Sequence, residues 1–290
     1  MTAAALAPTP EPEAVPRRRD DERLNPRSSI PFFLLHLTPL LVIWTGITRT
    51  ALLLFLVTYF GRMFLITATY HRYLAHKTFR LGRVPQFVMA FGATTAAQKG
   101  PLWWAAHHRT HHKFTDTDLD VHTPKRGVFW SHVGWILCDR YGPTDYDSIK
   151  DFARYPELRF LNRFDWIGPW SLGAACFLIG GWSGLVVGFF CSTVLLWHVT
   201  FSVNSLAHIV GRRTYDTDDT SKNSLLLALA TGGEGWHNNH HRYASSARQG
   251  FRWWQIDTTY YGLRLLSWVG VVKDLRPVPR RILDEARTRA

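Results

Sequence analysis

Cysteine is scarce in this chain, and its scarcity excludes several kinds of site. The 290 residues include three cysteines, Cys138, Cys176 and Cys191, and no two of them form a Cys-x-x-Cys pair. A disulfide framework, a zinc ribbon and an iron–sulfur cluster all need more cysteines, or cysteines more closely spaced. We therefore expect the three to be small buried hydrophobic residues.

Several other features are also missing. No glycine-rich dinucleotide fingerprint, flavin motif or fused haem domain is visible, so any electrons that the chain uses must come from a separate protein. The first residues contain no apolar core followed by a small-residue cleavage site, so we expect no signal peptide. No repeat of solenoid length occurs.

Long apolar runs, in contrast, are abundant. Hydrophobic residues make up 46% of the chain, with 13 Trp and 18 Phe. Four runs approach the length of about 20 residues that is needed to cross a bilayer. They cover residues 30–48, 51–70, 166–182 and 183–203. We predict four transmembrane helices in two hairpins; the alternative is a large soluble helical protein whose core helices are apolar.

The placement of positive charge supports the membrane interpretation. A net charge of +12 would raise nucleic acid as a partner of a soluble protein. Of the 34 Lys and Arg, however, only two, Arg49 and Arg62, lie inside an apolar run or in the short turn between the first two runs. The others lie in residues 1–29, 71–165 and 204–290. By the positive-inside rule these three parts face the cytoplasm, which predicts a multi-pass protein with cytoplasmic termini and no nucleic-acid partner. Arg62 is expected to face protein.

The domain organisation follows from these patterns. Residues 1–29, rich in Ala, Pro and charge, predict a disordered tail. Residues 30–275 predict one all-α membrane domain with a helical cap on its cytoplasmic side, and residues 276–290 a short basic tail. The apolar and small residues of 84–108 suit a helix at the membrane interface.

Histidine is concentrated in four motifs. They read HRYLAH from His71, HHRTHH from His107, NSLAH from Asn204 and HNNHH from His237. On a helix, residues three and four apart share one face, so each of the last three motifs presents its side chains together. His71 and His76 are five apart and can converge only where their helix ends or bends.

Nine of these histidines predict a site for two metals. They are His71, His76, His108, His111, His112, His208, His237, His240 and His241. Neutral imidazole is the commonest metal ligand, and nine are too many for one metal. With Asn204 holding a water, they give two sites of five or six ligands, which suits iron better than zinc. The alternative for an isolated histidine is a hydrogen-bonded core residue, which we expect for His36, His122, His132 and His198.

The motifs in this order, with SHVGW at 131–135 and GEGWHNNHH at 233–241, resemble the membrane-bound fatty acyl-CoA desaturase family, in particular its stearoyl-CoA (delta-9) type. The resemblance covers residues 30–275. It implies one iron held by His71, His76, His108, His112 and His240. It implies a second iron held by His111, His208, His237 and His241, with Asn204 acting through water. His107 adjoins the second motif as a non-ligand.

The same resemblance implies the reaction and its partners. Two Fe²⁺ ions would use O2 and electrons from a separate donor protein to insert a cis double bond, at the delta-9 position, into a saturated acyl chain. Gln98, Trp104 and Thr200 would shape the acyl tunnel, and Trp103, Trp236 and Phe201 are further candidate walls. Among nearby carboxylates, Asp116, Asp118, Asp120 and above all Glu234 could orient ligand imidazoles.

One departure from the family concerns the headgroup. Acyl-CoA members place an Arg-Asp pair just before the second histidine motif, where this chain has Ala106 and His107. Lys99, Lys113, Arg126 and Arg140 lie nearby in sequence. We therefore predict acyl-CoA as substrate through a rearranged headgroup site that includes Arg140 and Lys113, with a phospholipid-linked chain as the alternative.

Two rival functions remain open at this stage. A di-iron hydroxylase could use the same scaffold, because the outcome depends on where the second hydrogen sits. A non-catalytic metal-binding or transport protein of the membrane would place its ionisable ligands at mid-span, whereas here they cluster at the cytoplasmic ends of the runs.

Overall fold

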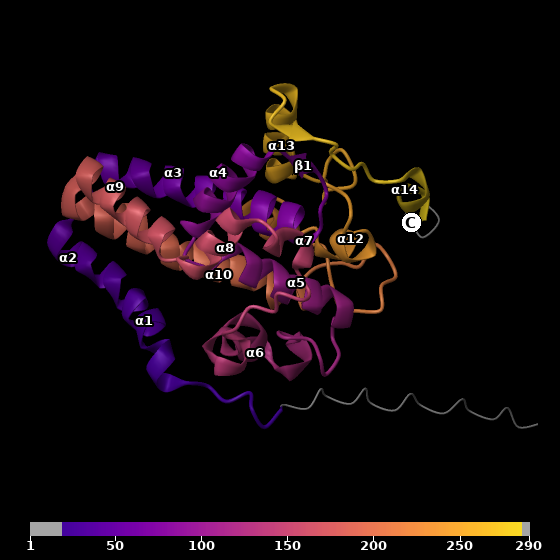
Figure 1. Ribbon diagram of the computed structural model, residues 1–290, viewed down its shortest axis with the longest axis horizontal. Helices are drawn as coiled ribbons and strands as arrows, with labels where there is room; N and C mark the ends of the chain where they lie inside the picture. The colour runs from indigo at the N-terminus through magenta and orange to yellow at the C-terminus, as the bar shows by residue number, and fades with distance from the viewer. Residues whose placement is uncertain (1–18, 286–290) are drawn as a thin grey trace, which may run out of the picture.

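The computed structural model describes residues 19–285, which fold almost entirely into helices (Figure 1). The strands in this part of the chain are two short ones, β1 (Arg80–Leu81) and β2 (Val272–Lys273), which pair antiparallel. Three helical stretches are long and apolar enough to cross a membrane: Pro26–Thr45, Arg49–Ala75 and Ile167–His208. The fold is therefore mostly helical and rich in membrane-type helices, as predicted.

The first apolar stretch is a broken helix at the edge of the molecule. It consists of α1 (Pro26–Leu37), the short 3₁₀ segment η1 (Thr38–Leu41) and α2 (Val42–Thr45). Asn25 caps its start by accepting hydrogen bonds from the backbone N–H groups of Arg27 and Ser28. It ends at Gly46, whose φ of 64° lies in the left-handed region that favours glycine. The predicted run of 30–48 therefore began and ended too late.

The second stretch is longer than predicted. The helix α3 (Arg49–Leu65) continues without a break into a π-helical segment, η2 (Ile66–Ala75). The run of apolar residues indicated an end at residue 70. The polar residues that follow remain helical because they are buried, so they pack against protein and not against lipid or water.

Arg62 lies inside this stretch and faces protein, as expected. Its guanidinium donates to Thr193 Oγ1 and Ser192 Oγ, both at 2.6 Å, and to the carbonyl oxygen of Thr58 at 2.9 Å. The side chain is 2% exposed. These hydroxyl and carbonyl acceptors compensate for removing the charge from water.

The third stretch turns back on itself. It consists of α9 (Ile167–Ser183), the π-helical η6 (Gly184–Cys191), α10 (Ser192–Asn204) and the 3₁₀ turn η7 (Leu206–His208). Gly181 has φ 59° and ψ −153°, a non-helical conformation available almost only to glycine. After this break η6 packs against α9, so closely that a Cβ on Gly184 would lie 2.4 Å from the carbonyl oxygen of Cys176. Two limbs result, with their boundary one residue from the predicted 182/183 junction.

The remaining helices gather at one end of the long ones (Figure 1). The helix α4 (Arg83–Thr94) packs on α3 and α9, α5 (Pro101–Phe114) packs on η2, and α8 (Pro156–Arg163) packs on α4 and α5. The other elements of this cap are η3 (Pro124–Arg126), α6 (Val128–His132), η4 (Gly134–Leu137), η5 (Asp139–Tyr141), α7 (Lys150–Ala153), α11 (Leu225–Ala230), α12 (His237–Arg242), α13 (Thr258–Trp268) and α14 (Arg280–Glu285).

The described part of the N-terminal tail is ordered, contrary to the prediction, and the described part of the C-terminal tail contains a helix. Residues 1–18 and 286–290 lie outside the described residues. Glu22, expected in a disordered tail, is fully buried and accepts a 2.8 Å hydrogen bond from Arg126. In the predicted C-terminal tail, Ile282 of α14 is fully buried and belongs to a small core with Tyr215 and Phe251. Short charged segments were taken for tails because their few apolar residues are too widely spaced to show a period.

Candidate metal centre

A π-helix brings His71 and His76 together. In an α-helix, residues five apart point about 140° away from each other. In η2 the hydrogen bonds run over five residues, as in the 3.1 Å bond from the backbone N–H of His76 to the carbonyl oxygen of His71. The two imidazole rings consequently meet edge to face, with their centroids 4.8 Å apart and their planes at 79°, at the end of the helix where the sequence required a bend.

Two further helices divide their histidines between two groups. In α5, His108 and His112 are one turn apart and belong to the first group with the histidines of η2, while His111 belongs to the second group. In α12, His240 joins the first group, and His237 and His241 join the second. The helix spacing thus predicted the clustering correctly, but the motifs of α5 and α12 each supply both groups.

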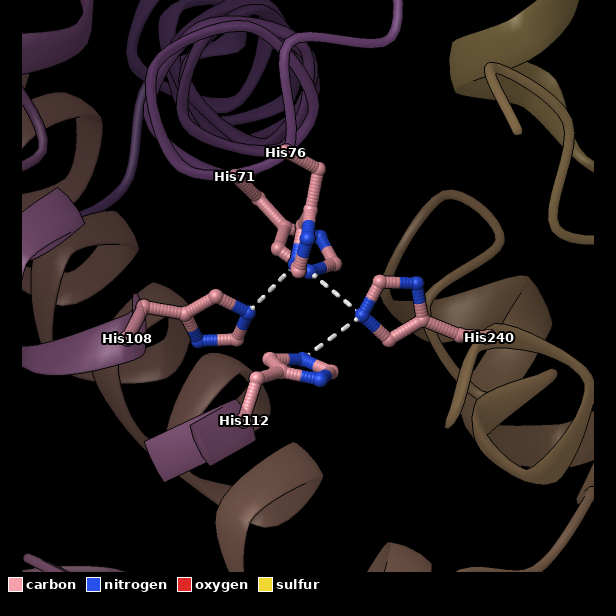
Figure 2. A group of neighbouring side chains, drawn as sticks. All are labelled: His71, His76, His108, His112 and His240. Atoms are coloured by element: carbon pink, nitrogen blue, oxygen red, sulfur yellow. Dashed lines mark hydrogen bonds between the residues drawn. The ribbon is translucent and has the colours of Figure 1, made fainter. Parts of the chain in front are cut away.

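The first group contains five imidazoles that point at one another (Figure 2): His71, His76, His108, His112 and His240. Nε2 atoms in three pairs lie 3.1 Å apart (His71 and His240), 2.9 Å apart (His76 and His108) and 2.9 Å apart (His112 and His240). One ligand atom from each residue lies within 4.8 Å of every other.

The second group contains four: His111, His208, His237 and His241. The Nε2 atom of His237 lies 3.1 Å from that of His208 and 3.0 Å from that of His241. The groups adjoin, with the rings of His112 and His241 4.5 Å apart. These are the two sets that the resemblance implied. Asn204 lies one turn before His208, and its water-mediated role stays a prediction.

Carboxylates hold the outer nitrogen of several rings. The Nδ1 atom of His71 lies 2.5 Å from Glu234, that of His111 2.9 Å from Asp120, and that of His241 2.7 Å from Asp219. A carboxylate accepts, so each Nδ1 carries the proton and each Nε2 turns a lone pair toward its group. Glu234, the preferred candidate from the sequence, and Asp120 thus contact ligand imidazoles.

The other two candidate carboxylates lie farther out. Asp116 accepts from Thr220, whose hydroxyl lies 3.1 Å from His208 Nδ1, so it acts through a second residue. Asp118 is exposed, and its backbone carbonyl accepts from Arg126. Asp219 was missed by the sequence reasoning. The acidic run TDD at 217–219, between the last two histidine motifs, was the available signal.

Glu234 also anchors the first motif to the rest of the cap. The guanidinium of Arg72, next to His71, lies 2.9 Å from Glu234 and 2.9 Å from Asp257, and it donates to the carbonyl oxygen of Ala247. Gln249 donates to Glu234 at 2.6 Å. Removing one partner from such a buried set costs about 3–5 kcal/mol, because a charge is left uncompensated.

The electrostatics favour neutral imidazoles and an ionised carboxylate. Burial lowers the pKa of His76, His108, His112 and His240 well below the ordinary 6.5, and neighbouring imidazoles lower it further. For Glu234 burial acts to raise the pKa, but His71 and Arg72 outweigh it and lower the pKa to about 2. Neutral imidazole is the form that binds a metal.

This donor set fits two first-row transition metals. Lone pairs of neutral Nε2 atoms about 3 Å apart repel each other unless a cation lies between them. Two ligands at right angles, each about 2.1 Å from one metal, would be about 3.0 Å apart, close to the separations observed. Nitrogen donors without thiolate suit iron among other first-row metals. The nine histidines would hold the ions in sets of five and four.

A cavity of about 910 Å³ runs from the first group toward the far end of α9. Its wall includes His108 and all three predicted tunnel residues, Gln98, Trp104 and Thr200. Gln98 donates to Thr200 at 2.7 Å. Trp103 and Phe201 also line it, whereas Trp236 does not and donates its indole N–H to Ile256 instead.

The two residues predicted to bind the headgroup, Arg140 and Lys113, lie away from the cavity. Arg140 pairs with Asp21, and the ammonium group of the exposed Lys113 lies 4.9 Å from the ring centroid of Phe114; neither side chain lines the cavity. His107 does line it, packed between Trp103 and Trp135, and burial lowers its pKa, so it carries no charge to offer a phosphate.

Three histidines outside the two groups form the hydrogen bonds expected of non-ligands. His198 lies 2.9 Å from His36 and 3.0 Å from His132, nitrogen to nitrogen. His122 differs. Its Nδ1 atom is buried without a hydrogen-bond partner, and its ring lies 4.2 Å from that of His111.

Comparison with known proteins agrees with this site. A sequence model of the family described as fatty acid desaturase matches residues 47–266. The chain belongs to the fatty acid desaturase family. It is 37% identical over 270 residues to the sn-2 palmitoyl-lipid 9-desaturase of Nostoc sp. (strain 36), covering 91% of this chain and 94% of that protein. An acyl-CoA 5-desaturase of Anemone leveillei is 39% identical over 219 residues, 74% of this chain and 68% of that protein. Delta-9 acyl-lipid desaturase 2 of Arabidopsis thaliana is 40% identical over 214 residues, 73% of this chain and 70% of that protein.

Proposed function

We propose that this desaturase inserts a cis double bond, at the delta-9 position, into a saturated acyl chain with O2 as oxidant. The observation that carries the proposal is that His108 belongs both to the first histidine group and to the wall of the apolar cavity. An acyl chain in this cavity would place its methylene groups beside the metal ligands. Two Fe²⁺ ions, when bound, would activate O2, the oxidant that removal of hydrogen from a methylene group requires.

The reaction balances with two external electrons. Two hydrogens leave adjacent methylene carbons, and O2 takes these, two protons and two electrons to give two waters. The protein itself would position the acyl chain and the ligand imidazoles and would exclude water from the site. Glu234, Asp120 and Asp219 would hold ligand imidazoles in one tautomer. The Gln98–Thr200 hydrogen bond satisfies two polar side chains in an otherwise largely apolar wall.

The electrons would come from a separate protein. The sequence contains no motif for a bound nicotinamide or flavin, and the basic cap suits an acidic carrier.

We further propose four membrane crossings, with α9 and the η6–α10 limb as the third and fourth. A straight helix of 42 residues would be about 63 Å long, twice the hydrocarbon thickness of about 30 Å, whereas the break at Gly181 gives two limbs of suitable length. The basic cap and both termini would be cytoplasmic.

For the form of the substrate we propose a lipid-linked acyl chain. Lys99, Asp139 and Asp165 are the charged residues, histidine aside, among the described residues that line the cavity. One positive and two negative charges do not favour the phosphates of CoA. The Nostoc relative, which aligns over nearly the whole chain, is named for a lipid-linked palmitoyl chain. Acyl-CoA, predicted from the sequence, is the competing form.

Product analysis tests both parts of the proposal. Isotope-labelled stearoyl chains, on CoA or on phosphatidylcholine, are given to membranes with a competent electron donor and no acyl transfer. We expect a cis-9 double bond in the phospholipid. Conversion of acyl-CoA alone would overturn the lipid-linked form, and a hydroxylated chain would indicate the rival hydroxylase.

A further inference from the structure

The cavity opens sideways, at the level of the membrane helices. Trp170, Phe177 and Trp182 of α9 line the cavity, yet they are 73%, 38% and 65% exposed. Exposed fractions this large indicate that these lining side chains lie at the rim of an opening. Trp170 and Phe177 are seven residues apart and so lie on one face of α9.

The opposite rim is α1. Pro31, Phe32 and Leu35 of this helix line the same cavity. The stretch that contains α1 is hardly buried: 6% of its most apolar window is inside the molecule, against 44% for the second stretch. Figure 1 shows α1 and α2 along the edge of the helical bundle. The opening therefore lies between a well-packed helix and a loosely attached one.

A few contacts hold α1 in place. The ring of Phe32 stacks on Trp197, 5.3 Å between centroids and 2° from parallel. His36 donates from Nδ1 to the carbonyl oxygen of Phe32, which leaves its Nε2 to accept from His198 of α10, and His198 in turn lies 3.0 Å from His132 of α6. This three-histidine bridge connects the outer helix to the cap, away from the metal ligands.

The surroundings of the opening indicate what covers it. Both rims belong to stretches that are long and apolar enough to cross a membrane. From Trp166 to Phe177 the rim extends about 16 Å, roughly half the hydrocarbon thickness. The charged lining residues, Lys99, Asp139 and Asp165, all lie outside these stretches, toward the cap. The opening thus faces lipid tails, while the polar end of the cavity lies near the headgroups.

We propose that the opening between α1 and α9 is a lateral entrance through which the acyl chain of a bilayer lipid passes into the cavity while its headgroup stays at the membrane surface. The proposal rests on the proposed function and specifies how a lipid-linked substrate reaches the metal centre. Acyl-CoA would not need this entrance, because it approaches from water.

Photolabelling of the inner cavity tests the entrance without turnover. The protein, in a background with its three cysteines replaced, is placed in vesicles of phosphatidylcholine that carries a diazirine in a saturated acyl chain. Phe177→Cys, at the rim, is alkylated with a bulky pyrene maleimide. The control is Leu178→Cys, whose native residue is 82% exposed but does not line the cavity. Labelling at Gln98, 8% exposed and deep in the cavity, is read by mass spectrometry.

We expect labelling at Gln98 in the unmodified protein and in alkylated Leu178→Cys, and its loss in alkylated Phe177→Cys. Equal labelling in the two alkylated variants, or equal loss, would overturn the lateral entrance. So would labelling by a diazirine acyl-CoA but not by the phospholipid. Labelling needs neither O2 nor electrons. A protein that admits the lipid but forms no double bond would therefore contradict the proposed function and leave the entrance standing.

Discussion

At the scale of single residues, histidines and carboxylates have different roles in the site. The nine imidazoles supply lone pairs, and the carboxylates fix which nitrogen of a ring carries the proton. Glu234 serves His71 and also neutralises Arg72, so its loss would disturb both metal binding and folding. Asp219 contacts His241 and, among residues 19–285, otherwise accepts hydrogen bonds only from Thr217 and Ser221 of its own loop. It is therefore the better probe of the carboxylate's role.

We predict that Asp219→Asn weakens iron binding by about 10–100-fold, the usual effect of removing a hydrogen-bonding partner of a ligand imidazole. The amide keeps the size of the side chain but accepts a hydrogen bond less strongly than an ionised carboxylate. Iron content measured against free iron concentration checks this. Asp118→Asn is the matched control, and equal affinity in the two variants would show that Asp219 does not tune its ligand.

Glu22 gives a pH-dependent prediction away from the metals. Burial raises its pKa, but hydrogen bonds from Tyr141, the backbone of Arg19 and Arg126 outweigh this and lower the pKa below 4.5. A lowered carboxylate pKa stabilises the folded state above the unfolded value, and this stabilisation is lost as the pH falls below about 4.5. We expect proteolysis within residues 19–26 to increase in acid. Glu22→Gln should be cleaved readily at neutral pH; the same protection as the native protein would be contrary to the account.

The three- and four-residue spacing predicted which imidazoles of the motifs at His107 and His237 point together, because such residues share a helix face. The five-residue spacing of His71 and His76 required a bend, which the π-helix supplies. Which imidazole joins which group came from the resemblance, since spacing alone treats His108 and His111 alike. Asp219 could not be predicted with confidence, because it is 22 residues from His241 in sequence and meets it only through folding of the intervening loop. The exposed opening beside α9 depends on how loosely α1 packs, which no local pattern encodes.

At the scale of elements, departures from the ordinary α-helix create the site. The π-helix η2 aligns His71 with His76, and the break at Gly181 reverses the third stretch. The break coincides with the sequence Gly-Gly-Trp-Ser-Gly at residues 180–184. The five-residue spacing of His71 and His76 was the one sign of the π-helix in the sequence. The length of the second apolar run was underestimated because buried polar residues continue its helix to Ala75.

We predict that Gly181→Ala destabilises the protein by about 1–3 kcal/mol, the cost of forcing a residue with a Cβ into this conformation. The site itself has open space, so strain is the only penalty. Gly61→Ala is the matched control: it also has open space, but it lies inside α3 with helical geometry, where alanine is favoured over glycine. Thermal unfolding in detergent measures both, and equal midpoints would exclude a special role of the break.

At the scale of the whole molecule, the two histidine groups lie at the cap end of the bundle, and the cavity leads from the first group into the apolar bundle. This arrangement predicts an orientation. A cysteine at Ser245, in the cap, should not react with an impermeant maleimide applied to intact cells from outside. A cysteine at Ile47, 58% exposed in the turn between the first two stretches, should react. Reaction of the cysteine at Ser245 but not of the cysteine at Ile47 would show that the topology is the inverse of the one proposed.

The central claim is that two adjacent histidine groups hold two irons. The most direct measurement is the metal content of the purified full-length protein, loaded with Fe²⁺ and analysed by mass spectrometry of the elements. We predict two irons per chain, falling in His240→Ala, which removes a ligand of the first group, and in His208→Ala, which removes one of the second. His107→Ala should keep both. One zinc per chain in iron-loaded protein, or two irons retained in both ligand variants, would contradict the account.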